Sequence, residues 1–299
     1  MAKFICTADW HIRATRPRCR TDENWIETQR NALVQIKKIS VEKNAPVFVV
    51  GDLFHSNSDT SFECIQLVQS LADELGELYI LAGNHDLPYH SSENINKSAI
   101  GILLNSSHIF QIKDFFESWK WNTSERINYS ASNFDEVDNK DAEIVFKHTL
   151  VFPDLKSLPP NVDAITAKEL LEEFPNAKWI FTGDYHRNFH YEKNGRHVVN
   201  PGCLLRQASD MKNYKCGVYY VDTDENIVEF VPIIDNESFV DDRYILKQEE
   251  REERIESFVD KLSDTKNVSL DFVDNVQKAM LENNFGFEIK TVVEELMEV

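Results

Sequence analysis

The stretch Gly83-Asn84-His85-Asp86 decides how this chain is organised, because it places three polar side chains directly after an apolar run. That run, residues 78–82 (Leu-Tyr-Ile-Leu-Ala), predicts a buried strand, and the glycine that follows it marks a turn. Amide, imidazole and carboxylate groups can bind a metal ion or move protons. A single turn of this kind is weak evidence for a site.

Four other apolar runs end in the same kind of polar turn. Residues 4–8 lead into Asp9-Trp10-His11, residues 47–50 into Gly51-Asp52-Leu53-Phe54-His55, residues 143–147 into His148, and residues 179–182 into Gly183-Asp184-Tyr185-His186. Open α/β sheets gather their ligands at the C-terminal edge of the strands, so we expect these side chains to meet. A mixed set of Asp, His and Asn suits two divalent cations, Mn²⁺ best and Mg²⁺ next.

Alternating strands and helices define the expected fold. Residues 24–44 and the segment that begins near Phe62 have helical periodicity between the first three strands, which predicts parallel crossovers. Asn194-Gly195 predicts a hairpin turn, and the second half of the chain is expected to be more antiparallel. We therefore predict an α/β fold: a two-sheet sandwich with outer helices, followed by a small, mainly helical C-terminal region. The predicted domains are residues 1–233 and 234–299.

Bulk properties limit the function classes. The chain has 299 residues, lacks an apolar run long enough to cross a membrane, and enters a strand without a leader-like segment, so a cytoplasmic protein without membrane contact is expected. Its five cysteines form no CxxC pair and are expected to be reduced. Walker, dinucleotide-binding and nucleophilic-serine motifs are absent from the sequence.

The charge distribution leaves the type of substrate open. A net charge of -19 argues against a simple polyanion binder, but residues 234–299 hold 18 acidic and 8 basic residues and so account for -10 of it. The densest basic segment follows the first polar turn and contains Arg13, Arg16, Arg18 and Arg20. It is either a solvated loop or a loop that grips phosphate beside the metals.

Together, the ordered polar turns resemble the motifs of the calcineurin-like metallophosphoesterases over about the first 205 residues. Within that superfamily, residues 52–55 (Asp-Leu-Phe-His), residues 200–202 (Asn-Pro-Gly) and residues 204–206 (Leu-Leu-Arg) resemble SbcD-type DNA nucleases of bacteria and phages. The resemblance implies 3′-to-5′ exonuclease and endonuclease action on DNA in recombination, repair or end processing. It also implies an SbcC-like, SMC-type ATPase as partner, a phage or bacterial origin, and allows a homodimer.

The resemblance also implies a role for each motif residue. Asp9, His11 and His186 would hold one metal, Asn84 and His148 the other, and Asp52 would bridge them. His85 would be the acid beside the leaving oxygen, and His55 would contact the scissile phosphate or strand end. The chain departs from the usual Gly-His-x-His at Asp184, where an oxygen ligand predicts a harder metal site that favours Mn²⁺ or Mg²⁺.

Two other function classes stay open at this stage. The same fold could serve as a small-molecule phosphodiesterase or protein phosphatase, which the acidic composition favours, or as a non-catalytic binding subunit. His190 is close enough in sequence to His186 to be a peripheral substrate contact, although a role without chemistry is the simpler interpretation. Residues 234–299 could form a reduced cap over the DNA site or dock on the partner.

Overall fold

A computed structural model describes residues 2–57, 60–122, 128–159, 162, 164–241, 243 and 280, without the side chains of residues 119–122. By internal contacts the chain divides into two units, residues 1–241 and 242–299, and the description below concerns the first. Apart from residue 280, the predicted helices of residues 244–299 lie outside the described residues. No helix in the described part is long and apolar enough to cross a membrane.

The first sheet is built around the parallel strands that the sequence predicts. In the described part of the chain its strands run in the order β13 (Ile227–Pro232), β12 (Gly217–Asp222), β1 (Lys3–Thr7), β2 (Val47–Val50), β3 (Leu78–Leu81) and β4 (Ile109–Gln111). Strands β1 to β4 are parallel, whereas β12 and β13 pair antiparallel.

The second sheet is more parallel than predicted. Its order is β10 (Phe189–Lys193), β11 (Arg196–Asn200), β9 (Trp179–Gly183), β6 (Ile144–His148) and β5 (Tyr129–Ser132), and among these only β10 runs antiparallel to its neighbour. The hairpin at Asn194-Gly195 is confirmed. Because β10 takes the edge of the sheet, the hairpin returns β11 in the direction of β9, and the two strands pair in parallel. Two short strands, β7 (Val151–Phe152) and β8 (Ile165–Thr166), form a separate parallel pair.

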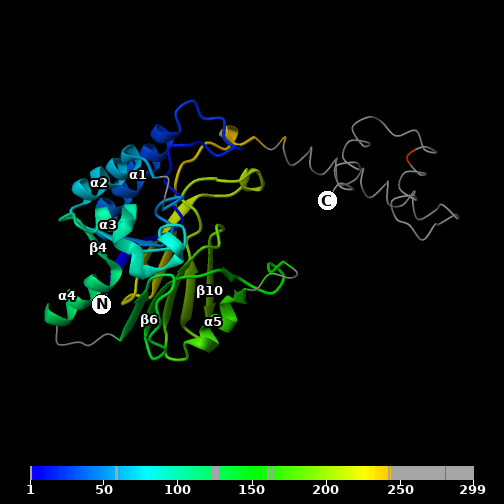
Figure 1. Cartoon of the computed structure of the whole chain (residues 1–299). Helices are drawn as coiled ribbons and strands as arrows, with labels where there is room; N and C mark the ends of the chain where they lie inside the picture. Colours follow the sequence, from blue (N-terminus) through cyan, green and yellow to red (C-terminus); the bar gives the residue numbers. More distant parts are fainter. Residues whose placement is uncertain are drawn as a thin grey trace. The chain divides into compact units, whose positions relative to one another are not determined.

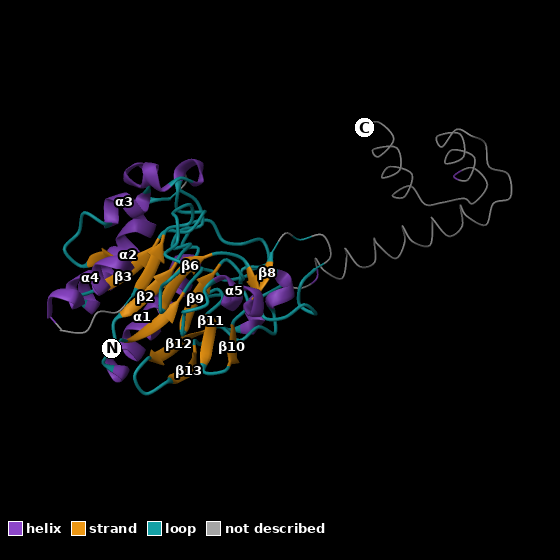
Figure 2. Ribbon diagram, turned by 90° about the horizontal axis from the view of Figure 1, so that it is seen from below, coloured by secondary structure: helices purple, strands orange, loops and turns teal. Residues whose placement is uncertain are grey.

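The two sheets pack face to face with helices on their outer faces, which confirms the predicted sandwich (Figures 1 and 2). The helices are α1 (Trp25–Lys43), α2 (Phe62–Leu75), α3 (Ala99–Leu103), α4 (Ile112–Asn122) and α5 (Ala167–Glu173). Helices α1 to α3 pack on the outer face of the first sheet and α5 on that of the second, whereas α4 packs Ile112 and Phe116 into the core between the sheets. Short 3₁₀ turns occupy Pro88–His90, Ser92–Lys97, Ser209–Met211 and Glu237–Phe239.

Strand β2 shows why the central strands are apolar on both faces. Val47 and Val49 pack against the helices, whereas Phe48 and Val50 face the second sheet. Between the sheets, Phe48 stacks on Phe4 with ring centroids 4.5 Å apart. A strand covered on both faces needs apolar residues at every position, so the pattern is continuous and not alternating.

Local signals set the ends of α1. Asn24 caps its first turn, its side chain accepting a hydrogen bond from the Glu27 amide, and Asn44 ends the helix in the left-handed conformation. The helix predicted for residues 24–44 is thereby confirmed. Residues 115–139 carry no clear pattern, and the structure places the end of α4 and strand β5 there.

The segment that follows β13, residues 233–241, is held within the first unit by charged groups. The Asp235 carboxylate accepts hydrogen bonds from Arg20 at 2.8 and 2.9 Å and from the Arg206 amide at 3.1 Å. This carboxylate therefore ties the segment to two loops that lie far away in the sequence.

Candidate metal centre

The polar turns meet because the strands that carry them are neighbours. The turns after β1 and β2 extend the parallel pairing beyond the sheet: the Asp9 amide donates to the Gly51 carbonyl at 3.1 Å, and the His11 amide to the Asp52 carbonyl at 3.0 Å. The other turns follow β3, β6 and β9, so all of them open on the C-terminal edge of the two sheets, as predicted.

Backbone strain marks the same turns. Asp9, His11, Asp52 and Asp184 all have positive φ, at 49°, 46°, 52° and 76°. Non-glycine residues avoid this region, and such strain persists where the surrounding structure holds it for a functional purpose. The strain therefore falls on four of the predicted metal ligands.

Two glycines allow the turns to approach one another. A Cβ atom at Gly51 would lie 2.0 Å from Nδ1 of His148, and one at Gly83 would lie 2.2 Å from Oδ1 of Asp52. Gly51 also has φ of +86°. The glycines of the motifs are thus needed because a ligand from another turn occupies the space where their side chain would be.

Asp52 lies at the centre of the cluster. Its Oδ1 accepts a hydrogen bond from the His85 amide at 3.0 Å. Its Oδ2 is buried and makes no hydrogen bond to the described residues, although it lies 3.7 Å from Nε2 of His11 and 3.4 Å from Nε2 of His148. One carboxylate oxygen is therefore left between two imidazoles, where it could be shared by two cations.

The structure brings the first predicted set of metal ligands together. Asp9, His11 and His186 each offer a ligand atom, and these atoms lie within 4.8 Å of one another. Nε2 of His11 and Nε2 of His186 are 3.0 Å apart. Burial lowers the pKa of both histidines, so their imidazoles are neutral and able to donate a lone pair to a metal.

The second predicted set gathers on the other side of Asp52. Nδ1 of His148 donates to the Val50 carbonyl at 2.9 Å, which leaves Nε2 directed at Asn84, whose Oδ1 is 3.1 Å away. A hydrogen bond from the remote nitrogen is the usual way of orienting a histidine ligand. The structure thus brings together Asn84, His148 and Asp52, while their roles as ligands stay predictions.

Asp184 joins the site mainly through its backbone. Its amide donates to both carboxylate oxygens of Asp9, at 3.0 and 3.2 Å. Its side chain belongs to none of the clusters of potential ligand atoms formed by the described residues. Its charge contributes to the raised pKa of His148 and opposes the lowering of the His186 pKa by burial. Asp184 therefore holds Asp9 in place, and direct ligation by its carboxylate stays a prediction.

The charges of the centre are strongly coupled. Burial opposes ionisation of Asp52, but the interactions with His148, His11 and His85 together outweigh burial and hold the pKa of this carboxyl well below its usual range. Burial likewise disfavours the charged form of His148, yet Asp52 raises its pKa to about 10. Burial raises the pKa of Asp9 to about 8. Without a cation, the site therefore holds protons that a bound cation would displace.

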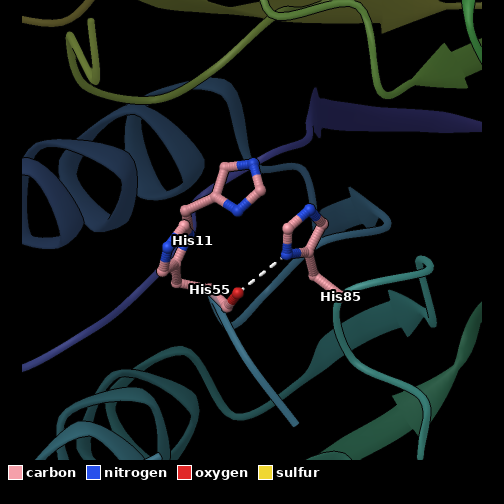
Figure 3. A group of neighbouring side chains, drawn as sticks. All are labelled: His11, His55 and His85. Atoms are coloured by element: carbon pink, nitrogen blue, oxygen red, sulfur yellow. Dashed lines mark hydrogen bonds between the residues drawn. The ribbon is translucent and has the colours of Figure 1, made fainter. Parts of the chain in front are cut away.

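His11, His55 and His85 form a second group at the mouth of the centre (Figure 3). Nδ1 of His85 lies 2.7 Å from the carbonyl oxygen of His55, and the two rings stack with centroids 5.6 Å apart. Burial, together with the charges of Arg13 and His85, lowers the pKa of His55 to about 4. His55 is therefore a neutral hydrogen-bonding group beside the predicted acid.

Asp86 has a role that the sequence did not reveal. Its buried carboxylate accepts hydrogen bonds from the amides of Leu53, Phe54 and Gly83, at 3.1, 2.9 and 2.9 Å. It thereby clamps the turn after β3 to the turn after β2. The motif itself was visible in the sequence, but the amides of Leu53 and Phe54 lie more than 30 residues away and show no local signal.

The arginine segment divides into residues with different surroundings. Arg13 is half-buried, and its guanidinium donates a hydrogen bond to Gln207 at 2.8 Å. Its Nε makes no hydrogen bond to the described residues. Its positive charge lowers the pKa of His55. Arg16 and Arg18 are exposed. Arg20 is buried, bonded to Asp22 and Asp235, and stacked over Trp25. This burial argues against the predicted phosphate contact for Arg20 and indicates a structural role.

The Asn200-Pro-Gly motif supports the turn after β9. The side chain of buried Asn200 donates to the carbonyl oxygens of Tyr185 and Arg187, at 2.6 and 3.0 Å, and so holds the residues on both sides of His186. Gly202 adopts φ of +68° where a Cβ would lie 2.4 Å from the Tyr214 hydroxyl. The motif therefore positions His186, a predicted ligand.

A family model described as calcineurin-like phosphoesterase matches residues 2–197. None of the curated proteins matches the sequence. Among solved structures, an archaeal phosphodiesterase is similar at 12% identity and a TM-score of 0.40, covering 77% of this chain and 99% of that one. A hypothetical protein from Pyrococcus horikoshii is similar at 13% identity and a TM-score of 0.42, covering 83% and 94%. Similarities at this level say nothing about substrate.

Proposed function

The chain belongs to the calcineurin-like phosphoesterase family, and on that premise we propose that it is a two-metal-dependent DNA nuclease. The proposed reaction is hydrolysis of phosphodiester bonds, by 3′-to-5′ exonuclease and endonuclease action, in DNA recombination, repair or end processing. The observation that carries the two-metal part is the buried Oδ2 of Asp52, which lies between His11 and His148 without a hydrogen bond to the described residues.

The donor set fits two divalent cations. A carboxylate oxygen that is buried without a hydrogen bond is costly unless a positive charge compensates it, and in the metal-free site protonated His148 supplies that charge. Asp9, His11 and His186 would hold one ion, Asn84 and His148 the other, and Asp52 would be shared, with Mn²⁺ preferred and Mg²⁺ the alternative. When bound, such ions supply a deprotonated water and neutralise phosphate charge.

The residues at the mouth would handle the substrate. His85 donates from Nδ1 to the His55 carbonyl, so its Nε2 is the nitrogen that can protonate the leaving oxygen. Arg13 offers a guanidinium nitrogen without a partner among the described residues, close enough to His55 to affect its charge, and would bind the phosphate. His55 would contact the scissile phosphate or strand end as a neutral donor.

DNA is favoured as substrate by two features. Residues 52–55 and 200–202 resemble the nuclease branch of the superfamily, and the structure gives both segments contacts within the centre. Arg13 supplies a positive charge close to His55, in a chain whose net charge is -19. Arg16 and Arg18 are exposed on the same loop and could follow the DNA backbone.

The test is digestion of linear duplex DNA labelled at either the 3′ or the 5′ end, in Mn²⁺, by the full chain and by its His85→Ala variant. The expected result is end degradation by the parent chain, with loss of the 3′ label first, and little by the variant. If neither cuts DNA while the parent hydrolyses a chromogenic phosphodiester, the DNA assignment is wrong and the phosphoesterase assignment holds.

That outcome would support the second candidate, a small-molecule phosphodiesterase or protein phosphatase. The net charge of -19 favours it, because an acidic surface repels a nucleic-acid backbone. The Arg13→Gln variant discriminates further. It should weaken DNA cleavage more than cleavage of a small diester, since a longer substrate uses more phosphate contacts.

An SbcC-like, SMC-type ATPase is the proposed partner, and residues 242–299 are the proposed segment that docks on it or caps the DNA site. The truncated variant that tests this segment should contain residues 1–241, because the bonds of Asp235 to Arg20 and Arg206 have to be kept. Retained diester hydrolysis with loss of DNA-end preference would indicate a cap; loss of ATPase binding would indicate a docking segment. Sedimentation of the full chain would test for a homodimer.

A further inference from the structure

A second cluster of potential metal ligands lies at the other end of β9 from the metal centre. His190 and Glu192 on β10 and His197 on β11 each offer a ligand atom, and these atoms lie within 4.8 Å of one another. His197 pairs with Trp179, the first residue of β9, whereas Asp184 follows the last. Four residues of strand span about 13 Å, so this cluster cannot share an ion with the metal centre.

The register of the hairpin brings the three side chains to one face. His190 and Glu192 are two residues apart on β10, and Glu192 lies directly opposite His197. Residues spaced by two, and residues paired across strands, point to the same side of a sheet. His190 and Glu192 are exposed at the edge strand, and His197 is buried. Ions in solution can therefore reach the cluster from the edge.

The surroundings of His197 turn one ring nitrogen, which is hydrogen-bonded to His190, toward the other two candidate ligands. Its Nε2 lies 3.3 Å from Oδ1 of Asn226, an oxygen that can only accept, so Nε2 carries the hydrogen. Nδ1 then presents a lone pair, and it lies 3.0 Å from Nε2 of His190. The ring is held by stacking on Trp179, with centroids 4.2 Å apart and planes 13° apart. A hydrogen bond on the remote nitrogen and a fixed ring are the usual features of a histidine ligand.

The chemistry of the donors selects the ion. Two neutral imidazole nitrogens and one carboxylate oxygen suit Zn²⁺, which takes three protein ligands and a water molecule in open sites. We propose that His190, Glu192 and His197 form a zinc site, separate from the catalytic centre, that clips the two strands of the β10–β11 hairpin together. The site would stiffen the edge of the second sheet without taking part in hydrolysis.

The first test counts zinc ions bound to the full chain by equilibrium dialysis and elemental analysis. His190→Gln and Glu192→Gln should each bind one ion fewer than the parent, while Mn²⁺-dependent diester hydrolysis stays within twofold. Both side chains are exposed, so the fold should be kept. His108→Gln is the matched control, since His108 is another surface histidine beside one carboxylate, Asp73, at 3.0 Å. Equal zinc counts for the parent and His190→Gln would overturn the proposal.

The second test uses Co²⁺ as a paramagnetic stand-in for Zn²⁺ and reads the fluorescence of Trp179. Co²⁺ bound at His197 should quench the emission of Trp179. This emission is the part of the protein's fluorescence that is absent from the Trp179→Phe variant. The quenching should persist in His108→Gln and vanish in His190→Gln. If Co²⁺ quenches the parent and His190→Gln equally, no ion binds at the hairpin and the proposal fails.

Discussion

The Nδ1 atom of His85 lies 2.7 Å from the carbonyl oxygen of His55, and this bond decides which nitrogen of His85 is available for catalysis. A carbonyl oxygen only accepts hydrogen bonds, so Nδ1 carries the hydrogen and Nε2 is left for proton exchange. His85, the proposed acid, and His55, the proposed phosphate-binding residue, are thus coupled through the backbone. A movement of the turn after β2 or of the turn after β3 would displace both side chains.

Replacing His85 by alanine should lower the turnover of a chromogenic phosphodiester by about 10²- to 10⁴-fold, the usual contribution of a general acid. Mn²⁺ binding, measured by calorimetry, should be unchanged because the side chain is not a predicted ligand. His90→Ala is the matched control, since Nδ1 of His90 also lies 3.0 Å from a carbonyl oxygen, that of Asn84. A turnover within a few-fold of the parent would show that His85 is not the acid.

Replacing Asp86 by alanine should destabilise the fold by about 2–5 kcal/mol in urea unfolding, because three buried amides lose their acceptor. Asp154 provides the comparison. It also accepts hydrogen bonds from two amides and a hydroxyl, at Lys156 and Ser157, but it is exposed and water can replace it. Asp154→Ala should therefore destabilise the fold much less than Asp86→Ala. Equal losses for the two variants would contradict the buried-clamp role.

Replacing Gly83 by alanine should both destabilise the fold, by about 1–3 kcal/mol, and weaken Mn²⁺ binding, because the new Cβ would press on Oδ1 of Asp52. Gly76→Ala is the control that separates the effect of a steric clash from the effect of backbone strain. Gly76 has φ of +81° but no atom near its missing side chain, so this variant should lose about 1 kcal/mol and bind Mn²⁺ normally. Normal Mn²⁺ affinity in Gly83→Ala would show that the turn can relax.

Metal binding should release protons. With its pKa raised to about 8 by burial, Asp9 is mostly protonated at pH 7 in the metal-free protein, and only its carboxylate can bind a cation. Apparent Mn²⁺ affinity should therefore rise as pH increases from 6 to 8, by about tenfold per unit for each proton released. The number of protons released on Mn²⁺ binding is measured by calorimetry at pH 7 in two buffers that differ in their heat of protonation. Identical binding heats in both buffers would mean that no proton leaves.

Asp184→His should shift the order of metal preference toward softer ions. An imidazole in place of the carboxylate removes a hard oxygen and a negative charge from the neighbourhood of His148 and His186. Activity with Zn²⁺ or Co²⁺ relative to Mn²⁺ should rise about tenfold or more, the usual size of changes in the shell around a metal. An unchanged metal order would show that Asp184 acts only through its amide bond to Asp9.

The polar turns and the strands before them were predictable from sequence because both signals are local. An apolar run such as residues 47–50 specifies a strand buried on both faces, and the glycine and aspartate after it specify a turn with a ligand. Parallel strands present such turns at one edge, so the composition of the metal centre could be predicted together with the sandwich. The hairpin at Asn194-Gly195 was predictable for the same reason.

What only the tertiary structure decided depends on pairing and burial between distant residues. Arg13 and Arg20 look alike in sequence, but the guanidinium of Arg20 is buried and bonded to Asp235, 215 positions away. The clamp at Asp86, the parallel pairing of β11 with β9 and the His190–His197 contact arise in the same way. Periodicity and turn chemistry describe neighbours along the chain, whereas these contacts are set by which strands come together in the sheet.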